Sequence, residues 1–330
     1  MKRIAIAIAI AALFAGARLT FGQGQGRHPF EDHSDNGEVV HILPTEASIH
    51  SPRDTQPSFA PDRDATAVYA PSYGKGQLID HGGHEMPNAA FYAIYWNSAV
   101  ANSNQTSLGY AKVSEQINAF IDNFPDNANY DGSSTDDYEI IQQYGSRDPI
   151  SSTLGNWGLL VDNKPAQSNI KDGALRSYLA DLFDSGRVLP STSTIYGLYL
   201  PAGMRVMLQG GMSCSSFCGY HGHFSYGSLQ IKYAVFPYLN CTACKLSNLS
   251  VADMLTIVTS HEIREAVTDP GDNNQNAWYD ASGYEADDKC AWHNLYQMTR
   301  GGFWVQPEYS NGGVKAGVSY PGPGCIVPNR

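Results

Sequence analysis

The stretch Ser250–Asp272, SVADMLTIVTSHEIREAVTDPGD, predicts one long helix and the motif that this helix carries. Ser250 stands at an N-cap position with Asp253 three residues later, which is a capping-box-like start. Apolar residues then recur at helical spacing: Val251, Met254, Leu255 and Val258. Because Pro270 disfavours helical geometry at the residue before it, the helix is expected to end near Val267 and to be followed by a turn.

The same helix contains His261-Glu262-x-x-Glu265, which is similar to the His-Glu-x-x-His helix of zinc peptidases except that glutamate replaces the second histidine. His261 and Glu265 lie in line with the apolar stripe, so both side chains should face a buried or cleft-lining space. A bound divalent cation would satisfy an imidazole and a carboxylate buried one turn apart. The alternative is a structural helix in which Arg264 or a lysine elsewhere neutralises the carboxylates.

Several residues could complete a set of metal ligands with His261 and Glu265. The segment NAWYDASGYEADDKCAW after the turn holds four acidic candidates: Asp280, Glu285, Asp287 and Asp288. His221 and His223 in CGYHGHF lie just before a predicted strand, and one of them could bind the metal or stabilise an oxyanion. For His223 a hydrogen-bonded loop histidine is the preferred interpretation. His81 and His84, beside a Gly-Gly turn, are likewise either functional histidines or hydrogen-bonded loop histidines.

The donor types in this motif restrict the metal and its chemistry. One imidazole and two carboxylates would neutralise a divalent ion, whereas two imidazoles and one carboxylate leave it positive. A neutralised ion is a weaker Lewis acid and lowers the pKa of a bound water less. We therefore expect one divalent metal, zinc by the motif, while the harder oxygen ligands also admit manganese, iron or calcium.

The N-terminus has the pattern of a secretory signal. The basic head Met1-Lys2-Arg3 precedes an apolar run and the small residues Ala15-Gly16-Ala17, which predicts a signal peptide over residues 1–22. The run is shorter than the roughly 20 apolar residues that a membrane-spanning helix needs. The mature protein is thus expected to be secreted, extracellular or periplasmic, and free of the membrane. A net charge of −11 argues against a nucleic-acid partner.

Export to an oxidising compartment makes disulfides the preferred interpretation of the six cysteines. Four of them fall within 31 residues and are expected to pair among themselves: Cys214, Cys218, Cys241 and Cys244. Cys290 is expected to pair with Cys325. The alternative is a zinc knuckle built from the Cys214-x3-Cys218-x2-His221 and Cys241-x2-Cys244 spacings.

Composition divides the 330-residue chain into a leader and one domain. Residues 23–75 are polar and rich in Pro, Ser, Asp and His, which predicts a flexible leader or pro-segment. Residues 76–330 hold the expected domain. Strands are predicted over 89–96, 139–145, 156–163, 193–208 and 229–239, and helices over 110–124 and 172–186. This interleaving favours an α/β or α+β fold with a mixed β-sheet.

Four blocks of sequence together resemble the Exordium-like (phosphate-induced) family of secreted proteins, in its bacterial form. They are SHEIREAVTDP, NAWYDASGYEADDKCAW, FCGYH, and the early HGG followed by an aromatic strand, spread from about Leu78 to Cys325. The resemblance implies a secreted, cell-wall-associated protein to which no catalytic activity is firmly attached. The motif helix itself resembles that of zincin metallopeptidases. Their thermolysin-like order places a glutamate ligand on a later helix, and Glu285, 20 residues after Glu265, has a similar spacing.

Two functions follow from these residues. The first is a secreted metal-dependent hydrolase, most similar to a zinc metallopeptidase, in which Glu262 takes a proton from the attacking water and returns it to the leaving amine. Its metal ligands are expected to be His261, Glu265 and Glu285, with Asp280, Asp288 or His221 as substitutes for the third. His221 is the second catalytic candidate.

The second function is a non-enzymatic extracellular or cell-wall-associated binding module with a structural metal ion. The many tyrosines and tryptophans would then stack on sugars. The partner is accordingly expected to be a peptide or a cell-wall glycan.

Overall fold

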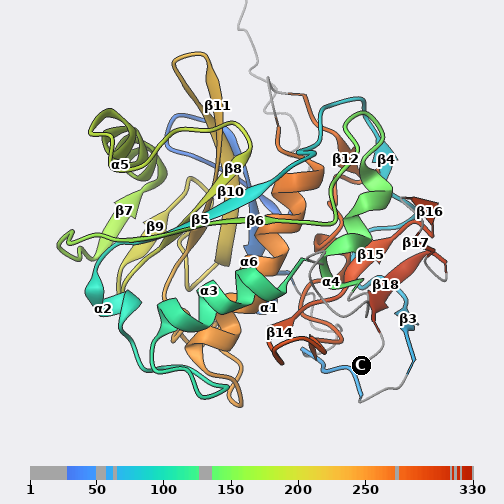
Figure 1. The fold of residues 1–330 in the computed structure, drawn as a ribbon. Helices are drawn as coiled ribbons and strands as arrows, with labels where there is room; N and C mark the ends of the chain where they lie inside the picture. Colours follow the sequence, from blue (N-terminus) through green and yellow to red (C-terminus); the bar gives the residue numbers. More distant parts are fainter. Residues whose placement is uncertain are drawn as a thin grey trace, which may run out of the picture.

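A seven-stranded mixed sheet forms the centre of the computed structural model, which describes residues 28–49, 57–61, 65–125, 136–271, 275–312, 314–315, 318–319 and 322–328. Its strand order is β1-β2-β10-β11-β8-β5-β6 (Figure 1). The bounds are β1 (Glu31–His33), β2 (Val39–Pro44), β5 (Ala90–Tyr95), β6 (Gly155–Val161), β8 (Thr194–Tyr199), β10 (Phe217–Tyr226) and β11 (Leu229–Phe236). Strands β11, β8, β5 and β6 are parallel, while β1, β2 and β10 pair antiparallel. The predicted mixed α/β fold is confirmed.

Helices cover both faces of this sheet. The long helix α6 (Val251–Thr268) and α3 (Val113–Asn123) lie on one face, and α5 (Asp172–Asp184) lies on the other (Figure 1). Alternate residues of β5 join the two separate hydrophobic clusters: Phe91 packs on the α6 side and Ile94 on the α5 side. This alternation is what a strand buried on both faces requires.

Helix α6 is buried along its whole length, because the sheet covers one side and the C-terminal part of the chain covers the other. The predicted capping box is confirmed: Oγ of Ser250 accepts a hydrogen bond from the backbone N–H of Asp253, and the Asp253 carboxylate accepts one from the N–H of Ser250. Polar groups on this helix therefore lie in the interior, where they need partners.

The remaining elements are short and surround this centre. The helices are α1 (Glu46–Ile49), α2 (Ser98–Ala101), α4 (Asp136–Glu139), η1 (Ile140–Tyr144) and η3 (Asp288–Cys290). Paired strands form small sheets: β12 (Trp278–Tyr279) with β4 (Ile79–Asp80), β13 (Tyr296–Gln297) with β14 (Trp304–Val305), β16 (Val314–Lys315) with β17 (Val318–Ser319), and β7 (Asn169–Lys171) with β9 (Arg205–Met207). The last small sheet has the order β15 (Glu308–Ser310), β18 (Gly324–Val327), β3 (Ala67–Tyr69).

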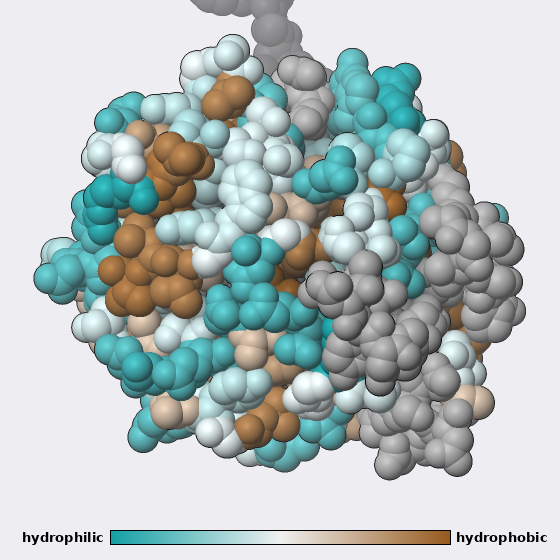
Figure 2. All heavy atoms as spheres, viewed as in Figure 1, coloured by the Kyte–Doolittle hydropathy of each residue, from teal (hydrophilic) through white to brown (hydrophobic). Residues whose placement is uncertain are grey.

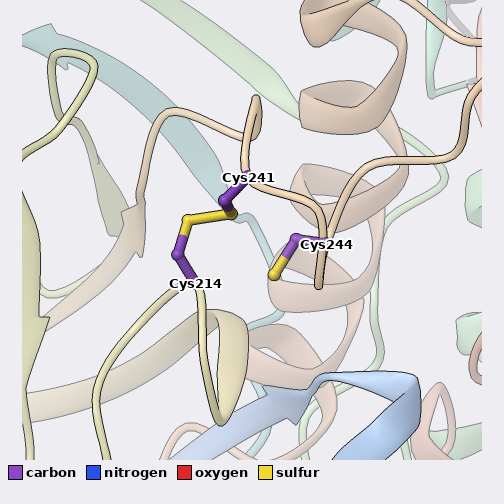
Figure 3. A group of neighbouring side chains, drawn as sticks. All are labelled: Cys214, Cys241 and Cys244. Atoms are coloured by element: carbon purple, nitrogen blue, oxygen red, sulfur yellow. A yellow bond between two sulfur atoms is a disulfide. The ribbon is translucent and has the colours of Figure 1, made fainter.

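Three disulfides agree with the predicted grouping, in which Cys290 pairs with Cys325 and the other four cysteines pair among themselves. They join Cys214 to Cys241, Cys218 to Cys244 and Cys290 to Cys325. Figure 3 shows the first bridge with the Cys244 sulfur beside it. Because all four clustered cysteines are bridged, the alternative of a zinc knuckle is wrong.

The leader prediction is wrong for residues 31–44, which form β1 and β2 at one edge of the central sheet. The segment Val39–Leu43 has four apolar residues around His41, which is too few to predict a strand within a polar stretch. It forms a strand because it pairs with β1 and β10. The segment 139–145 is also not a strand: η1 turns there, burying Ile140, Ile141 and Tyr144. The proposed signal peptide lies outside the described residues.

The surface is mixed in character. On the face shown in Figure 2, hydrophobic residues lie in separate patches among polar ones. Among the described residues, no helix is long and apolar enough to cross a membrane.

Candidate metal centre

Three parts of the chain bring histidines and acidic residues together beneath the sheet. Helix α6 supplies His261, Glu262 and Glu265, β10 supplies His221, and the segment before η3 and its first residue supply Glu285 and Asp288. Helix α6 can approach β10 closely because residue 219 is a glycine. A Cβ there would lie 2.3 Å from Cγ1 of Val258 and 2.9 Å from Oε1 of Glu262.

His261, Glu265 and Asp288 form the first donor group. Nε2 of His261 lies 3.0 Å from Oε2 of Glu265 and 3.8 Å from Oδ1 of Asp288. The three donor atoms lie within 4.8 Å of one another. Tetrahedral zinc with bonds of about 2.1 Å separates its donors by roughly 3.4 Å. The spacing of this group therefore fits a small divalent ion.

Backbone N–H groups orient both carboxylates of this group. The N–H of Asp288 donates to Oε1 of Glu265 at 2.9 Å, and the N–H of Glu285 donates to Oδ2 of Asp288 at 3.0 Å. In each carboxylate, one oxygen accepts a backbone hydrogen bond and the other oxygen faces His261. Support of this kind holds metal ligands in position.

His221 is the centre of a neighbouring group. Its Nδ1 hydrogen-bonds Oε2 of Glu262 at 3.1 Å and lies 3.8 Å from Oε2 of Glu265. Its Nε2 lies 3.9 Å from Oε2 of Glu285, which in turn lies 3.0 Å from Nδ1 of His41. The His41 and His221 rings stack in parallel, because these residues are direct partners across β2 and β10.

Burial dominates the electrostatics of the cluster. It raises the pKa values of Glu262, Glu265 and Asp288 well above their usual range, and the charge of Glu285 adds to this effect on each of them. Burial, with the nearby charge of Arg264, lowers the pKa of His261 to about 3. This imidazole is therefore neutral and able to bind a metal.

The two other histidine environments differ. Burial, reinforced by the neighbouring histidines, holds the pKa of His221 well below its usual range. Burial also acts to lower the pKa of His41, but the charge of Glu285 outweighs it and raises that pKa to about 10. The stacked pair thus combines a neutral ring at His221 with a protonated ring at His41.

Several polar atoms in the cluster have no hydrogen bond within the described part of the chain. They are Nε2 of His221, Oε1 of Glu262 and Oε1 of Glu285, whereas Nε2 of His261 and Oε2 of Glu285 have the 3.0 Å contacts to Glu265 and His41. Buried polar atoms without partners are rare and costly. A cation would compensate both the lone pairs and the surplus negative charge, so the donor set fits a divalent metal.

Arg264 does not neutralise the cluster. Its guanidinium points to the other side of α6, where it binds Asp287 and lies 2.7 Å from Glu308. The alternative in which Arg264 pairs with the motif is wrong.

Asp280 lies outside both donor groups, because its carboxylate binds Lys289 at 2.7 Å and accepts two backbone hydrogen bonds. Of the candidates for a third ligand, Asp288 joins His261 and Glu265, while Glu285 faces His41 and His221.

A cavity of about 260 Å³ opens onto this cluster. His41 and His221 are among its lining residues, and the side chain of His41 is 19 % exposed while that of His221 is only 3 % exposed. His223 and Asp269 are in its walls. Both histidines of CGYHGHF lie within β10, and not before a strand as predicted.

The HGG histidines are away from the cluster. The ring of His81 stacks on Tyr279 with centroids 3.6 Å apart, and Nδ1 of His84 lies 2.7 Å from the carboxylate of Asp148. His81 lines a different, polar cavity of about 580 Å³.

His41 is the one cluster residue that sequence reasoning missed. It lies in the segment that was expected to be a leader. The alternation around it, Val40-His41-Ile42, was the available signal for a strand with one face buried.

No protein-family model matches the chain, and comparisons with curated proteins and with solved structures return no significant match.

Proposed function

We propose that the protein is a secreted, metal-dependent hydrolase that cleaves peptide bonds, with one divalent ion, zinc, held by His261, Glu265 and Asp288. The observation that carries the proposal is a buried set of three donor atoms at metal-ligand spacing, with Glu262 beside it on the same helix. When bound, the ion would polarise the substrate carbonyl and activate water. The resemblance of the motif helix to that of zincin metallopeptidases supports the same assignment.

Glu262 is the general base in this proposal. His221 holds one of its oxygens through the 3.1 Å hydrogen bond, and the other oxygen has no hydrogen bond in the described chain. Burial raises its pKa, which makes it a stronger base once ionised and lets it keep the proton until the leaving amine accepts it. His221 is therefore a positioning residue for Glu262.

The second candidate is a non-enzymatic binding module with a structural ion. Its support is burial: His261, Glu265 and Asp288 are at most 3 % exposed, and closed sites are typical of structural metals. The cavity lined by His41 and His221 favours the hydrolase, because it reaches His221, the hydrogen-bond partner of Glu262, and a structural site needs no such opening.

Glu262→Gln tests the proposal. The variant should keep its metal and its melting temperature but lose turnover of a fluorogenic peptide library, by a factor of about 100 or more. The double variant His261→Ala, Glu265→Ala should lose the metal, measured by mass spectrometry. Peptide cleavage that survives in Glu262→Gln would contradict the mechanism.

Calcium in place of zinc, with glycan binding and no cleavage, would favour the binding module. No metal in the unaltered protein would contradict both functions.

A further inference from the structure

We infer that the cluster contains a second divalent-cation site, formed by His221, Glu262 and Glu265, and that filling it inhibits hydrolysis. The inhibitory part rests on the proposed function, because it requires Glu262 to be the base. The cation site itself rests only on geometry.

The second group has the same dimensions as the first. Nδ1 of His221 lies 3.1 Å from Oε2 of Glu262 and 3.8 Å from Oε2 of Glu265, and the three donor atoms lie within 4.8 Å of one another. The side chains are 3 %, 0 % and 1 % exposed, respectively. Glu265 belongs to both groups, so its carboxylate would bridge two ions. Bridged pairs of this kind have ions about 3.5–4 Å apart.

Unpartnered atoms beside this group point to a ligand independently of the spacing. Among the described residues, Oε1 of Glu262, Oε1 of Glu285 and Nε2 of His221 lack hydrogen bonds although they are buried. Oε2 of Glu285 differs, because it lies 3.0 Å from Nδ1 of His41. A single ion at His261, Glu265 and Asp288 leaves the first three atoms without a partner.

The negative charge of the cluster also favours a second cation. Four buried carboxylates face one another here: Glu262, Glu265, Glu285 and Asp288. Glu285 pairs with His41 at 3.0 Å, and one divalent ion balances two of the other three carboxylates. One negative charge therefore remains beside His221 for a second cation. Arg264 cannot do so, because Asp287 and Glu308 already bind it.

The two ions would differ in access and affinity. His221 lines the cavity, whereas no residue of the first donor group does, so the second ion exchanges with solvent more easily. It should bind roughly tenfold or more weakly, because it shares a ligand with a neighbouring positive ion. Once bound, it occupies the carboxylate that must accept a proton from the attacking water. Excess metal should therefore stop turnover while the protein stays folded.

The test begins with zinc stoichiometry. The metal-free protein is titrated with zinc by calorimetry, and metal content is measured after desalting. Two ions per chain are expected for the unaltered protein, and one for His221→Ala and His221→Gln. His223→Gln is the matched control, because this residue lies on the same strand and cavity wall but outside the donor group, and it should keep two.

Saturation at one ion in the unaltered protein would overturn the second site, as would two ions in both His221 variants. If those variants fail to fold, Glu262→Gln tests the second site instead. This variant should bind the first zinc ion unchanged and the second more weakly. Unchanged binding of both ions in Glu262→Gln would overturn the site.

The inhibitory part is tested with peptide turnover against free zinc. Turnover should fall as the second step saturates, and His223→Gln should behave in the same way. A rise instead of a fall would overturn inhibition and assign the second ion to catalysis. Absence of turnover at every zinc concentration would contradict the proposed hydrolase, while the stoichiometry still decides the second site.

Discussion

At the scale of single residues, the function of a side chain in this cluster depends on which neighbour holds it. Asp288 and Glu285 are both buried carboxylates three positions apart. Asp288 has one oxygen bound by a backbone N–H and the other turned toward His261. Glu285 instead faces His41 and His221. The same chemical group is thus a proposed metal ligand in one position and a partner for imidazoles in the other.

This difference predicts opposite results for two conservative substitutions. Asp288→Asn should lower the affinity of the first zinc ion by a factor of about 100, because a charged ligand is lost. Glu285→Gln should leave the first affinity within a few-fold of the unaltered protein, since its oxygens lie outside that donor group. Competition with a chromogenic chelator measures both. The reverse ranking would assign the third ligand to Glu285.

At the scale of elements, the site depends on how closely α6 approaches β10. Gly219 permits this approach, because any side chain at that position would enter the space of Val258 and Glu262. Helix α6 ends at Thr268, with Asp269 as its C-cap before Pro270, and Gly271 in the following turn lies close to His223. The strand and the end of the helix together define the cavity wall.

Gly219→Ala should destabilise the protein by about 1–3 kcal/mol, the usual cost of overpacking a core. Zinc affinity should fall with it, because Glu262 and α6 must move. Gly222→Ala in the same strand is the control: its Cβ would meet nothing nearer than 3.1 Å, so its loss should be smaller. Urea unfolding measures the free energy of unfolding of both variants. An equal loss in the two would show that residue 219 does not limit how closely α6 approaches β10.

An ion pair between elements gives a pH-dependent prediction. Burial acts to raise the pKa of Asp162, but hydrogen bonds from Arg187 and Tyr178 outweigh it and hold that pKa at about 2. The folded pKa is below the unfolded value of about 3.9, so the resulting stability is present above pH 4 and is lost between about pH 4 and 2.

Asp162→Asn should therefore cost about 2 kcal/mol at pH 6 and almost nothing at pH 2. Chemical denaturation at both values measures the difference. A loss that does not depend on pH would mean that packing, and not the charge, stabilises this contact.

At the scale of the whole molecule, the cluster combines residues of β10 and α6 with residues from distant parts of the described chain. Strand β2 near the N-terminus supplies His41, and the segment 285–288 supplies two carboxylates. The Cys290–Cys325 disulfide ties that segment to β18 in a neighbouring sheet. Distant covalent and β-sheet contacts thus hold the site in place.

The disulfides should consequently differ in their effect on metal binding. Replacing Cys290 and Cys325 with alanine should cost about 2–5 kcal/mol and also weaken zinc binding, because Asp288 lies two residues away from the bridge. Replacing Cys214 and Cys241 should cost a similar stability with little change in zinc affinity. Thermal unfolding and chelator competition separate the effects, and equal losses of affinity would contradict this role.

Local chemistry allowed much of this protein to be predicted from its sequence. Capping by Ser250, the apolar stripe and the stop at Pro270 define α6 without reference to the rest of the chain. The grouping of four neighbouring cysteines, the Cys290–Cys325 pair and the His261-Glu262-x-x-Glu265 motif were also predicted, but which partners the first four cysteines take was left open.

Only the tertiary structure decided which distant residues complete the site. The choice of Asp288, the contact of His221 with Glu262 and the presence of His41 all depend on strand pairing and on chain reversal across long loops. Strand pairing adds hydrogen bonds between segments far apart in sequence, and no pattern within one segment identifies its partner. The alternation in β2 could therefore indicate a strand, but only its pairing with β10 shows that β1 and β2 form an edge of the central sheet and not a leader.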